Sequence, residues 1–261
     1  MLRMLIVILA IISVLMSSEY TCGLDKMQLR LIREIYDISK RYKAIDGHVF
    51  NDTVVAIYLT ESDAGKNVIG DKNKLFTGRL SLLDASLGPG QIRLITALEM
   101  LDRYNNTFPK RYRYLRHPNY HAYKKFLYYK QKVSYYKRIY KRYSRKKYKS
   151  DRDRRVIRWS LREYKYWKNK YKQYWREIYS RYYHKDIRIM NLLLTDPNFY
   201  VTVSVLKLID SYNTALKKKM WNPYFKAISR YNGGWTNKRY YQRVMKKMRI
   251  VRCLKRHGYL K

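Results

Sequence analysis

The chain has 261 residues, enough for one domain of about 150 residues with its own core and one additional element. Its formal net charge is +39, from 58 Lys and Arg against 19 Asp and Glu. This excess excludes a neutral or acidic surface. It predicts a polyanionic partner, such as nucleic acid, an anionic membrane face or an acidic cell-wall polymer.

The first 18 residues are typical of a secretory signal peptide. A positive charge at Arg3 precedes an unbroken apolar run from Met4 to Met16, and two serines follow. The run is shorter than the roughly 20 apolar residues of a membrane-spanning helix. Neither serine has a small residue two positions earlier, as a cleavage site usually requires. The position of cleavage is therefore uncertain, and an uncleaved membrane anchor remains an alternative. We expect an exported protein, periplasmic or associated with the cell envelope, which argues against intracellular nucleic acid as the partner.

Two cysteines, Cys22 and Cys253, lie near opposite ends of the chain. In an oxidising compartment they can form one intramolecular bridge, which would close a loop of about 230 residues. Two free or intermolecular thiols are the alternative, because the sequence does not give the distance between them. The histidines at 117, 121 and 184 lack metal-ligand spacing to acids or cysteines, so we expect no metal. No nucleotide-binding motif or nucleophile elbow is present, and we expect no cofactor.

Apolar spacing predicts two helices in the first part of the chain. One runs from Asp25, its cap, to Ala44. The second covers residues 53–62, is opened by cap residues at 51–53 and carries Glu61 on its last turn, although its valines would favour a strand. A loop is predicted over 63–80 from its glycines. The expected buried face of the first helix is Met27, Leu31, Ile35, Ile38 and Tyr42.

The stretch Gly88-Pro89-Gly90 is predicted to open a helix from Gln91 to Arg103. Glycine has no Cβ, so the backbone there can approach a ligand closely, and Gln91 would project into the ligand. Most glycine-rich helix entries are plain turns, so this stretch is weak evidence by itself.

Residues 110–190 differ from the rest in composition, with 29 Lys and Arg, 5 Asp and Glu, and 18 of the 30 tyrosines. Neither glycine nor proline occurs between Pro118 and Pro197, as long helices require. Apolar residues recur every three or four positions on both sides of an interruption at 144–153. This spacing predicts two helices of about 25 to 35 residues that fold back as a basic hairpin. The expected seams are Phe126, Tyr129, Val133, Tyr136, Tyr140 and Tyr143 against Ile157, Leu161, Tyr164, Trp167, Tyr171, Tyr174 and Ile178.

The aromatic residues of this hairpin are interpreted as its own core. Its dense positive charge opposes folding unless anions screen it, so the hairpin is predicted to bind anionic envelope polymers or a membrane surface. Alternating basic and aromatic residues also suit single-stranded nucleic acid, which export makes the lesser option.

Three further helices are predicted after residue 190. The first starts at Asp196-Pro197 and runs to about residue 216. The second covers 223–231 and is stopped by Gly233. The third is capped by Thr236, runs to about residue 256 and carries Cys253.

Three short stretches occur in order along the chain: Glu61-Ser62, Gly88-Pro-Gly-Gln91, and Ala227-Ile-Ser-Arg-Tyr231-Asn232-Gly233-Gly234. The series resembles the motifs of the soluble lytic transglycosylases, which share the lysozyme-like fold. In that family a Glu-Ser pair ends a helix, a Gly-x-x-Gln stretch follows, and an Ala-x-x-Tyr-Asn-x-Gly-like stretch closes the cleft. The departures are extra residues before Tyr231, loose spacing between the first two motifs, and Arg93 where relatives often have an apolar residue.

The resemblance covers about 45–103 and 191–248. It implies a mainly α fold with a lysozyme-like catalytic domain in two parts, 19–109 and 191–261. The long basic helical hairpin, residues 110–190, would be inserted between the second and third motifs.

The resemblance also implies an activity on peptidoglycan glycan strands. The β-1,4 bond between N-acetylmuramic acid and N-acetylglucosamine would be cleaved to a 1,6-anhydro end, with Glu61 as general acid and then as base. Tyr231 would hydrogen-bond Glu61 and orient it, while Gln91 and Asn232 would hold the sugars. Ser62 would fix the helix end.

Two alternatives stay open. A lysozyme-like muramidase would hydrolyse the same bond and needs a second acid, for which Asp63, Asp71 and Asp84 are the candidates. The other is a non-catalytic envelope scaffold that binds polyanions through the hairpin. The presence of Glu61, Gln91 and Tyr231 argues against such a degenerate site.

Overall fold

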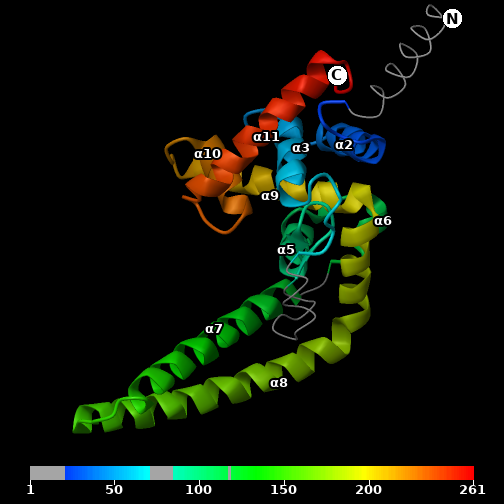
Figure 1. Cartoon of the computed structure of the whole chain (residues 1–261). Coiled ribbons are helices and arrows are strands. Elements are labelled where there is room, and N and C mark those ends of the chain that lie inside the picture. The colour runs from blue at the N-terminus through cyan, green and yellow to red at the C-terminus, as the bar shows by residue number, and fades with distance from the viewer. Residues whose placement is uncertain (1–20, 71–84, 117–118) are drawn as a thin grey trace, which may run out of the picture.

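The computed structural model describes residues 21–70, 85–116 and 119–261 (Figure 1). The predicted signal peptide and residues 71–84 lie outside the described residues. The described chain is mainly helical, as the sequence predicts. Its two short strands, β1 (Ser86–Leu87) and β2 (Ile92–Arg93), pair antiparallel, with Ser86 opposite Arg93.

Helix α3 (Asn51–Glu61) lies at the centre of the body of the molecule. Every residue from Thr53 to Leu59 is buried, and α2 (Lys26–Ser39), α9 (Pro197–Lys217) and α11 (Lys238–Arg256) pack against it (Figure 1). A helix that is apolar on all sides belongs inside a core. Burial on every side therefore outweighs the strand preference of its valines.

Helix α2 begins as predicted and ends early. Asp25 and Gln28 form a reciprocal capping box, and the helix stops at Ser39 instead of Ala44. The predicted buried face is partly wrong, because Met27 is 84% exposed. Ile35 and Ile38 are buried as predicted, and the other buried residues of the helix are Gln28, Ile32, Tyr36 and Ser39.

The C-terminal helices follow the predicted order. Asp196 caps α9, and Asn222 caps α10 (Pro223–Tyr231). The cap of α11 is Asn237, one residue after the predicted Thr236, because its side chain accepts the Tyr240 backbone N–H. Cys253 on α11 forms a disulfide with Cys22. This bond joins two segments that are 231 residues apart in the chain.

The Gly88-Pro89-Gly90 stretch turns between β1 and β2 and does not open a helix. Helix α5 (Leu94–Arg103) starts three residues after the predicted Gln91. Gly88 has φ +71°, and a Cβ there would lie 1.8 Å from the carbonyl oxygen of Leu193. Gly88 therefore allows close approach to a neighbouring helix.

Two long helices form the predicted hairpin, α7 (Asn119–Ser144) and α8 (Asp151–Thr195) (Figure 1). Helix α7 has 26 residues, about 39 Å at 1.5 Å per residue. Helix α8 has 45 residues, longer than expected, because it continues into the body, where Ile189, Met190 and Leu193 are buried. Before the hairpin, η2 (Asn105–Thr107) and α6 (Lys110–Arg113) also lie in the body.

Aromatic rings join the two helices of the hairpin. Tyr129 packs on Trp167 and Tyr174 with centroid distances of 5.6 Å each, and Tyr136 packs on Trp159 at 5.3 Å. Trp159 was outside the predicted seam. The side chains of Phe126 and Ile178 lie outside the described part of the molecule.

No single helix among the described residues is long and apolar enough to cross a membrane. The pair His184–Thr195 and Pro197–Lys217, bent by 93°, meets the length and composition criteria together.

Candidate active site

The three sequence motifs meet at one cleft of about 650 Å³. Glu61 reaches it from the end of α3, Gln91 from the turn before β2, and Tyr231 and Asn232 from the end of α10. Its other described lining residues are Gly70, Ser86, Ile92, Arg93, Thr96, Val203, Ser204, Lys207, Arg230 and Gly233. Glu61 and Asn232, 171 positions apart in the chain, thus lie within hydrogen-bond distance of each other.

A larger hollow of about 1200 Å³ lies along the outer side of α2. Charged side chains of both signs line it, among them Arg33, Glu34 and Asp37. None of the predicted site residues borders it, so we assign the candidate chemistry to the smaller cleft.

Glu61 is the half-buried last residue of the apolar helix α3. Burial raises the pKa of its carboxyl above the ordinary 4.5, and contacts with Tyr240, Asn232 and Arg243 offset part of that rise. The Asn232 side-chain amide donates a hydrogen bond to Oε1 at 3.3 Å. The carboxyl therefore keeps its proton to a higher pH than an exposed glutamate does.

Tyr240 is a neighbour of Glu61 that the sequence analysis missed. Its side chain is 3% exposed, and its hydroxyl oxygen is buried with no hydrogen-bond partner in the described part of the chain. The hydroxyl is near enough to lower the pKa of Glu61, although without the geometry of a hydrogen bond. Tyr240 begins the buried stripe of α11 with Val244, Val251 and Leu254, a spacing that marks it as a core residue. The spacing alone does not predict that Tyr240 lies beside Glu61.

The expected hydrogen bond between Tyr231 and Glu61 is not formed. Its hydroxyl donates to the carbonyl oxygen of Gly90 at 3.0 Å, so it must accept the proton of Ser204 Oγ, also at 3.0 Å. Ser204 in turn accepts from the Tyr58 hydroxyl at 2.9 Å. This chain of donors joins α3, α9, α10 and the Gly90 turn, and it holds the walls of the cleft in place.

Gln91 and Ser62 also stabilise the backbone around the cleft. Gln91 Nε2 donates to the carbonyl oxygens of Asn67 at 2.7 Å and Gly88 at 3.1 Å. Ser62 is buried as the C-cap of α3, and its Oγ accepts the Gly65 backbone N–H at 2.8 Å. Gln91 lines the cleft, whereas Ser62 does not.

Asp63, one of the three candidates for a second acid, lies outside the cleft. Its carboxylate is 48% exposed and lies 3.6 Å from Lys247 Nζ. Asp71 and Asp84 lie outside the described residues. Among the described residues that line the cleft, Glu61 is therefore the one acid.

A group of possible metal ligands is found away from the cleft, at Cys22, Cys253 and His257. Both sulfurs are joined in the disulfide, so they are not thiolate ligands in this form.

This arrangement can donate a proton into the cleft of about 650 Å³ and can take it back. It provides one carboxyl with a raised pKa, an amide donor that fixes the orientation of this carboxyl, and a hydroxyl network behind it. Comparison with protein-family models, with curated proteins and with solved structures returns no match for this chain.

Proposed function

We propose that the protein is a lytic transglycosylase of lysozyme-like fold that cleaves the β-1,4 bond between N-acetylmuramic acid and N-acetylglucosamine in peptidoglycan. The observation that carries the proposal is the convergence of three ordered motifs on one cleft, where Glu61 has a raised pKa. The disulfide between Cys22 and Cys253 fits an oxidising, envelope compartment and supports the predicted export.

In the proposed reaction the protonated Glu61 gives its proton to the glycosidic oxygen as the bond to the muramoyl C1 breaks. The substrate's own acetamido group stabilises the cationic carbon. Glu61, now a carboxylate, then accepts the proton of the muramoyl C6 hydroxyl while that oxygen bonds to C1. One carboxyl acts twice, and no water is consumed.

The second motif and the third motif support this role indirectly. Asn232 donates to Glu61 and holds one carboxyl oxygen, which leaves the other free to face the substrate. Tyr231 and Gln91 fix the walls around it. Tyr240 is the proposed second orienting residue, because its buried hydroxyl can complete a hydrogen bond to Glu61 once the site closes on substrate.

The experiment is digestion of purified peptidoglycan followed by mass spectrometry of the released fragments. We expect fragments with 1,6-anhydro ends, one water lighter than hydrolysis products, from the native protein and none from Glu61→Gln. Glu34→Gln, at an exposed position on α2, is the matched control and should keep full activity. Reducing ends would favour a muramidase. Equal release by Glu61→Gln would remove Glu61 from the mechanism, and no release at all would favour the scaffold.

We further propose that the hairpin binds anionic envelope polymers or an anionic membrane surface. Residues 137–158, the far end of the hairpin, hold twelve Lys and Arg and two Asp. Nearly all of these basic side chains are exposed, beside exposed rings such as Tyr135 and Trp159. A dense exposed positive field attracts polyanions in a salt-dependent way.

Tyr136 and Trp159 are in contact across the hairpin, so the chain between them can be replaced by a short loop. Replacing residues 137–158 by a short glycine-serine loop should leave glycan cleavage intact and reduce sedimentation with intact sacculi at low salt. The native protein should lose the same binding when salt is raised. Unchanged sedimentation of the shortened protein would leave the hairpin without this role.

A further inference from the structure

Three cations, Arg93, Lys207 and Arg230, line the same cleft as Glu61. They come from β2, α9 and α10, so three separate elements place positive charge at one site. Among the described lining residues the only acid is Glu61, whose raised pKa favours its neutral form. The described lining of the cleft therefore carries more positive than negative charge.

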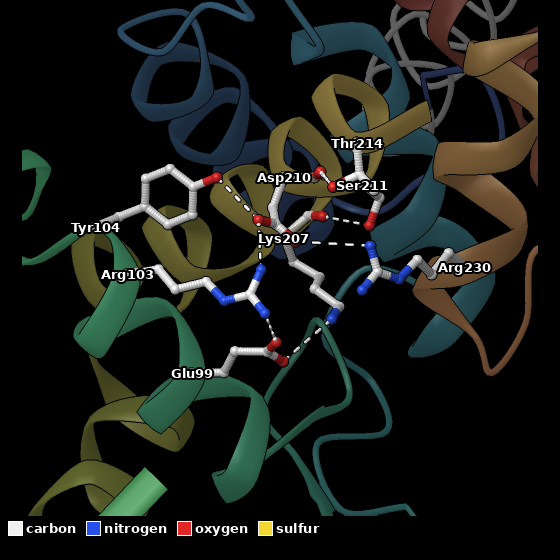
Figure 2. Close-up of polar contacts among 8 residues, drawn as sticks. All are labelled: Glu99, Arg103, Tyr104, Lys207, Asp210, Ser211, Thr214 and Arg230. Carbon is white, nitrogen blue, oxygen red and sulfur yellow. Dashed lines mark hydrogen bonds and ion pairs between the residues drawn. The ribbon is translucent and has the colours of Figure 1, made fainter. Parts of the chain in front are cut away.

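Two of these cations belong to a network behind the cleft wall (Figure 2). Its strong contacts lie away from the cleft: Arg103 bonds Glu99 and Asp210 at 2.9 Å each, and the Tyr104 hydroxyl donates to Asp210 at 3.0 Å. These contacts join α5 to α9. They account for the architectural role of the network without Lys207 or Arg230.

Lys207 and Arg230 are held more loosely than Arg103. Lys207 Nζ lies 3.4 Å from Glu99 Oε2, and Arg230 Nη1 lies 3.7 Å from Asp210 Oδ2 (Figure 2). Arg230 Nη1 is buried and makes no hydrogen bond in the described part of the chain, while its guanidinium covers the Trp235 ring at 4.4 Å. Both side chains therefore keep donor capacity for a ligand.

The electrostatic state of Lys207 supports this interpretation. Its side chain is 13% exposed. Burial lowers the pKa of its ammonium group and the charge of Arg230 lowers it further, while Glu99 counteracts both. Two half-buried cations that repel each other, each with one acid at 3.4 or 3.7 Å, would gain from a further anion placed in the cleft beside them.

We propose that Lys207 and Arg230, with Arg93 at the rim, form a subsite for a carboxylate carried by the muramoyl unit of the substrate. This inference rests on the proposed function, since it assumes that a glycan strand occupies the cleft. It adds that the enzyme selects a charged glycan over a neutral one of the same length. The carboxylate has two sources, the lactyl group of a bare glycan and the peptide attached to it.

The test is binding to the Glu61→Gln protein, in which the cleft is kept and cleavage is removed. Isothermal titration would compare four oligosaccharides of equal length: a bare GlcNAc–MurNAc glycan, its lactyl methyl amide, the same glycan with free peptide carboxylates, and an N-acetylglucosamine oligomer. We expect a carboxylate to tighten binding about tenfold over the methyl amide, because charge-assisted hydrogen bonds are the strong ones.

Variants locate the effect. Lys207→Met should remove most of the preference, and Arg93→Gln should weaken it without disturbing the network, because Arg93 is exposed and outside it. Lys217→Met, at an exposed position ten residues along the same helix, is the matched control and should keep the preference. Circular dichroism checks that each variant is folded. If Lys207→Met does not fold, the binding preference of Arg93→Gln decides whether the subsite exists.

Each pattern of binding has a distinct meaning. Tighter binding of the bare glycan alone identifies the lactyl carboxylate, and tighter binding of the peptide-bearing glycan alone identifies the peptide. Tighter binding of both shows that the subsite accepts either carboxylate. Equal binding of charged and neutral glycans overturns the subsite while leaving the glycan cleft. Binding of no glycan overturns the proposed function and the subsite together.

Discussion

Helices α3 and α7 are stabilised in opposite ways. In α3 every residue from Thr53 to Leu59 is buried, and its neighbours are apolar side chains of α2, α9 and α11. In α7 none of the described side chains is buried. It is held by ring contacts such as Tyr129 on Trp167, while most of its described lysines and arginines are exposed.

The difference teaches how each region is suited to its proposed role. Burial fixes α3 rigidly and also desolvates Glu61 at its end, so one cause gives both the position and the raised pKa of the candidate acid. The hairpin gains little from burial and carries repelling charges, so its stability depends on anions in its surroundings. Four predictions on stability and proteolysis test this contrast, in order of decreasing effect, and a fifth concerns activity.

The disulfide should stabilise the body and not the hairpin. Replacing Cys22 and Cys253 together by serine releases a closed loop of more than 200 residues, which should lower the free energy of unfolding by about 3 to 5 kcal/mol. Denaturant unfolding measures the change, and limited trypsin digestion of the hairpin should proceed at an unchanged rate. Faster hairpin cleavage in the folded double mutant would show that the two regions are coupled.

The same substitution should cost more in α3 than in α7. Ile57 is fully buried, so Ile57→Ala should lower the free energy of unfolding by about 2 to 4 kcal/mol through lost burial and a residual cavity. Ile139 is half-buried, and Ile139→Ala should cost less than about 1 kcal/mol. Denaturant midpoints at equal slope give both values. Equal costs would contradict the contrast between the helices.

Trp167 should matter to the hairpin alone. It contacts Tyr128, Tyr129 and Tyr166, and each ring pair contributes about 0.5 to 1.5 kcal/mol. Trp167→Ala should therefore speed tryptic cleavage within the hairpin several-fold, and dextran sulfate should slow it again by screening the charge. The unfolding midpoint of the body should stay unchanged, as it should in Trp221→Ala, a control at a 78% exposed body tryptophan.

The smallest effect is the dependence of stability on the charge of Glu61. Its folded-state pKa lies above 4.5, so its stabilising contribution is complete below that pH and is lost as the pH rises through the folded value. Glu61→Gln should then melt at the same temperature as the native protein at pH 4 and slightly higher at pH 8. Glu34→Gln should show no such pH-dependent difference in melting temperature from the native protein. If both variants followed the native melting temperature equally at all pH values, the raised pKa of Glu61 would be contradicted.

The same titration predicts the pH dependence of activity. The proposed first step needs the protonated carboxyl, so the rate of glycan cleavage should fall as the pH rises through the raised pKa of Glu61. We expect Tyr240→Phe to move that alkaline limb upward, because the Tyr240 hydroxyl lowers the pKa of Glu61.

The helices themselves were predictable from the sequence, because local rules produce them. Asp25, Asp196 and Asn222 cap helices as their side chains predict. The lack of glycine and proline after Pro118 allowed α7 and α8. The errors lie at boundaries: Asn237 replaces Thr236 as a cap, and α8 continues past residue 190 because its last turns pack in the body.

The sequence by itself therefore determined where the helices lie to within a few residues, the basic hairpin and the three motifs. Tertiary structure decided what each motif residue contacts, because a hydrogen bond depends on distances between elements that no local pattern contains. It placed Asn232, not Tyr231, on Glu61, and it brought the unforeseen Tyr240 beside that carboxyl. It also placed the side chains of Lys207 and Arg230, to which the sequence assigned no role, in one wall of the cleft.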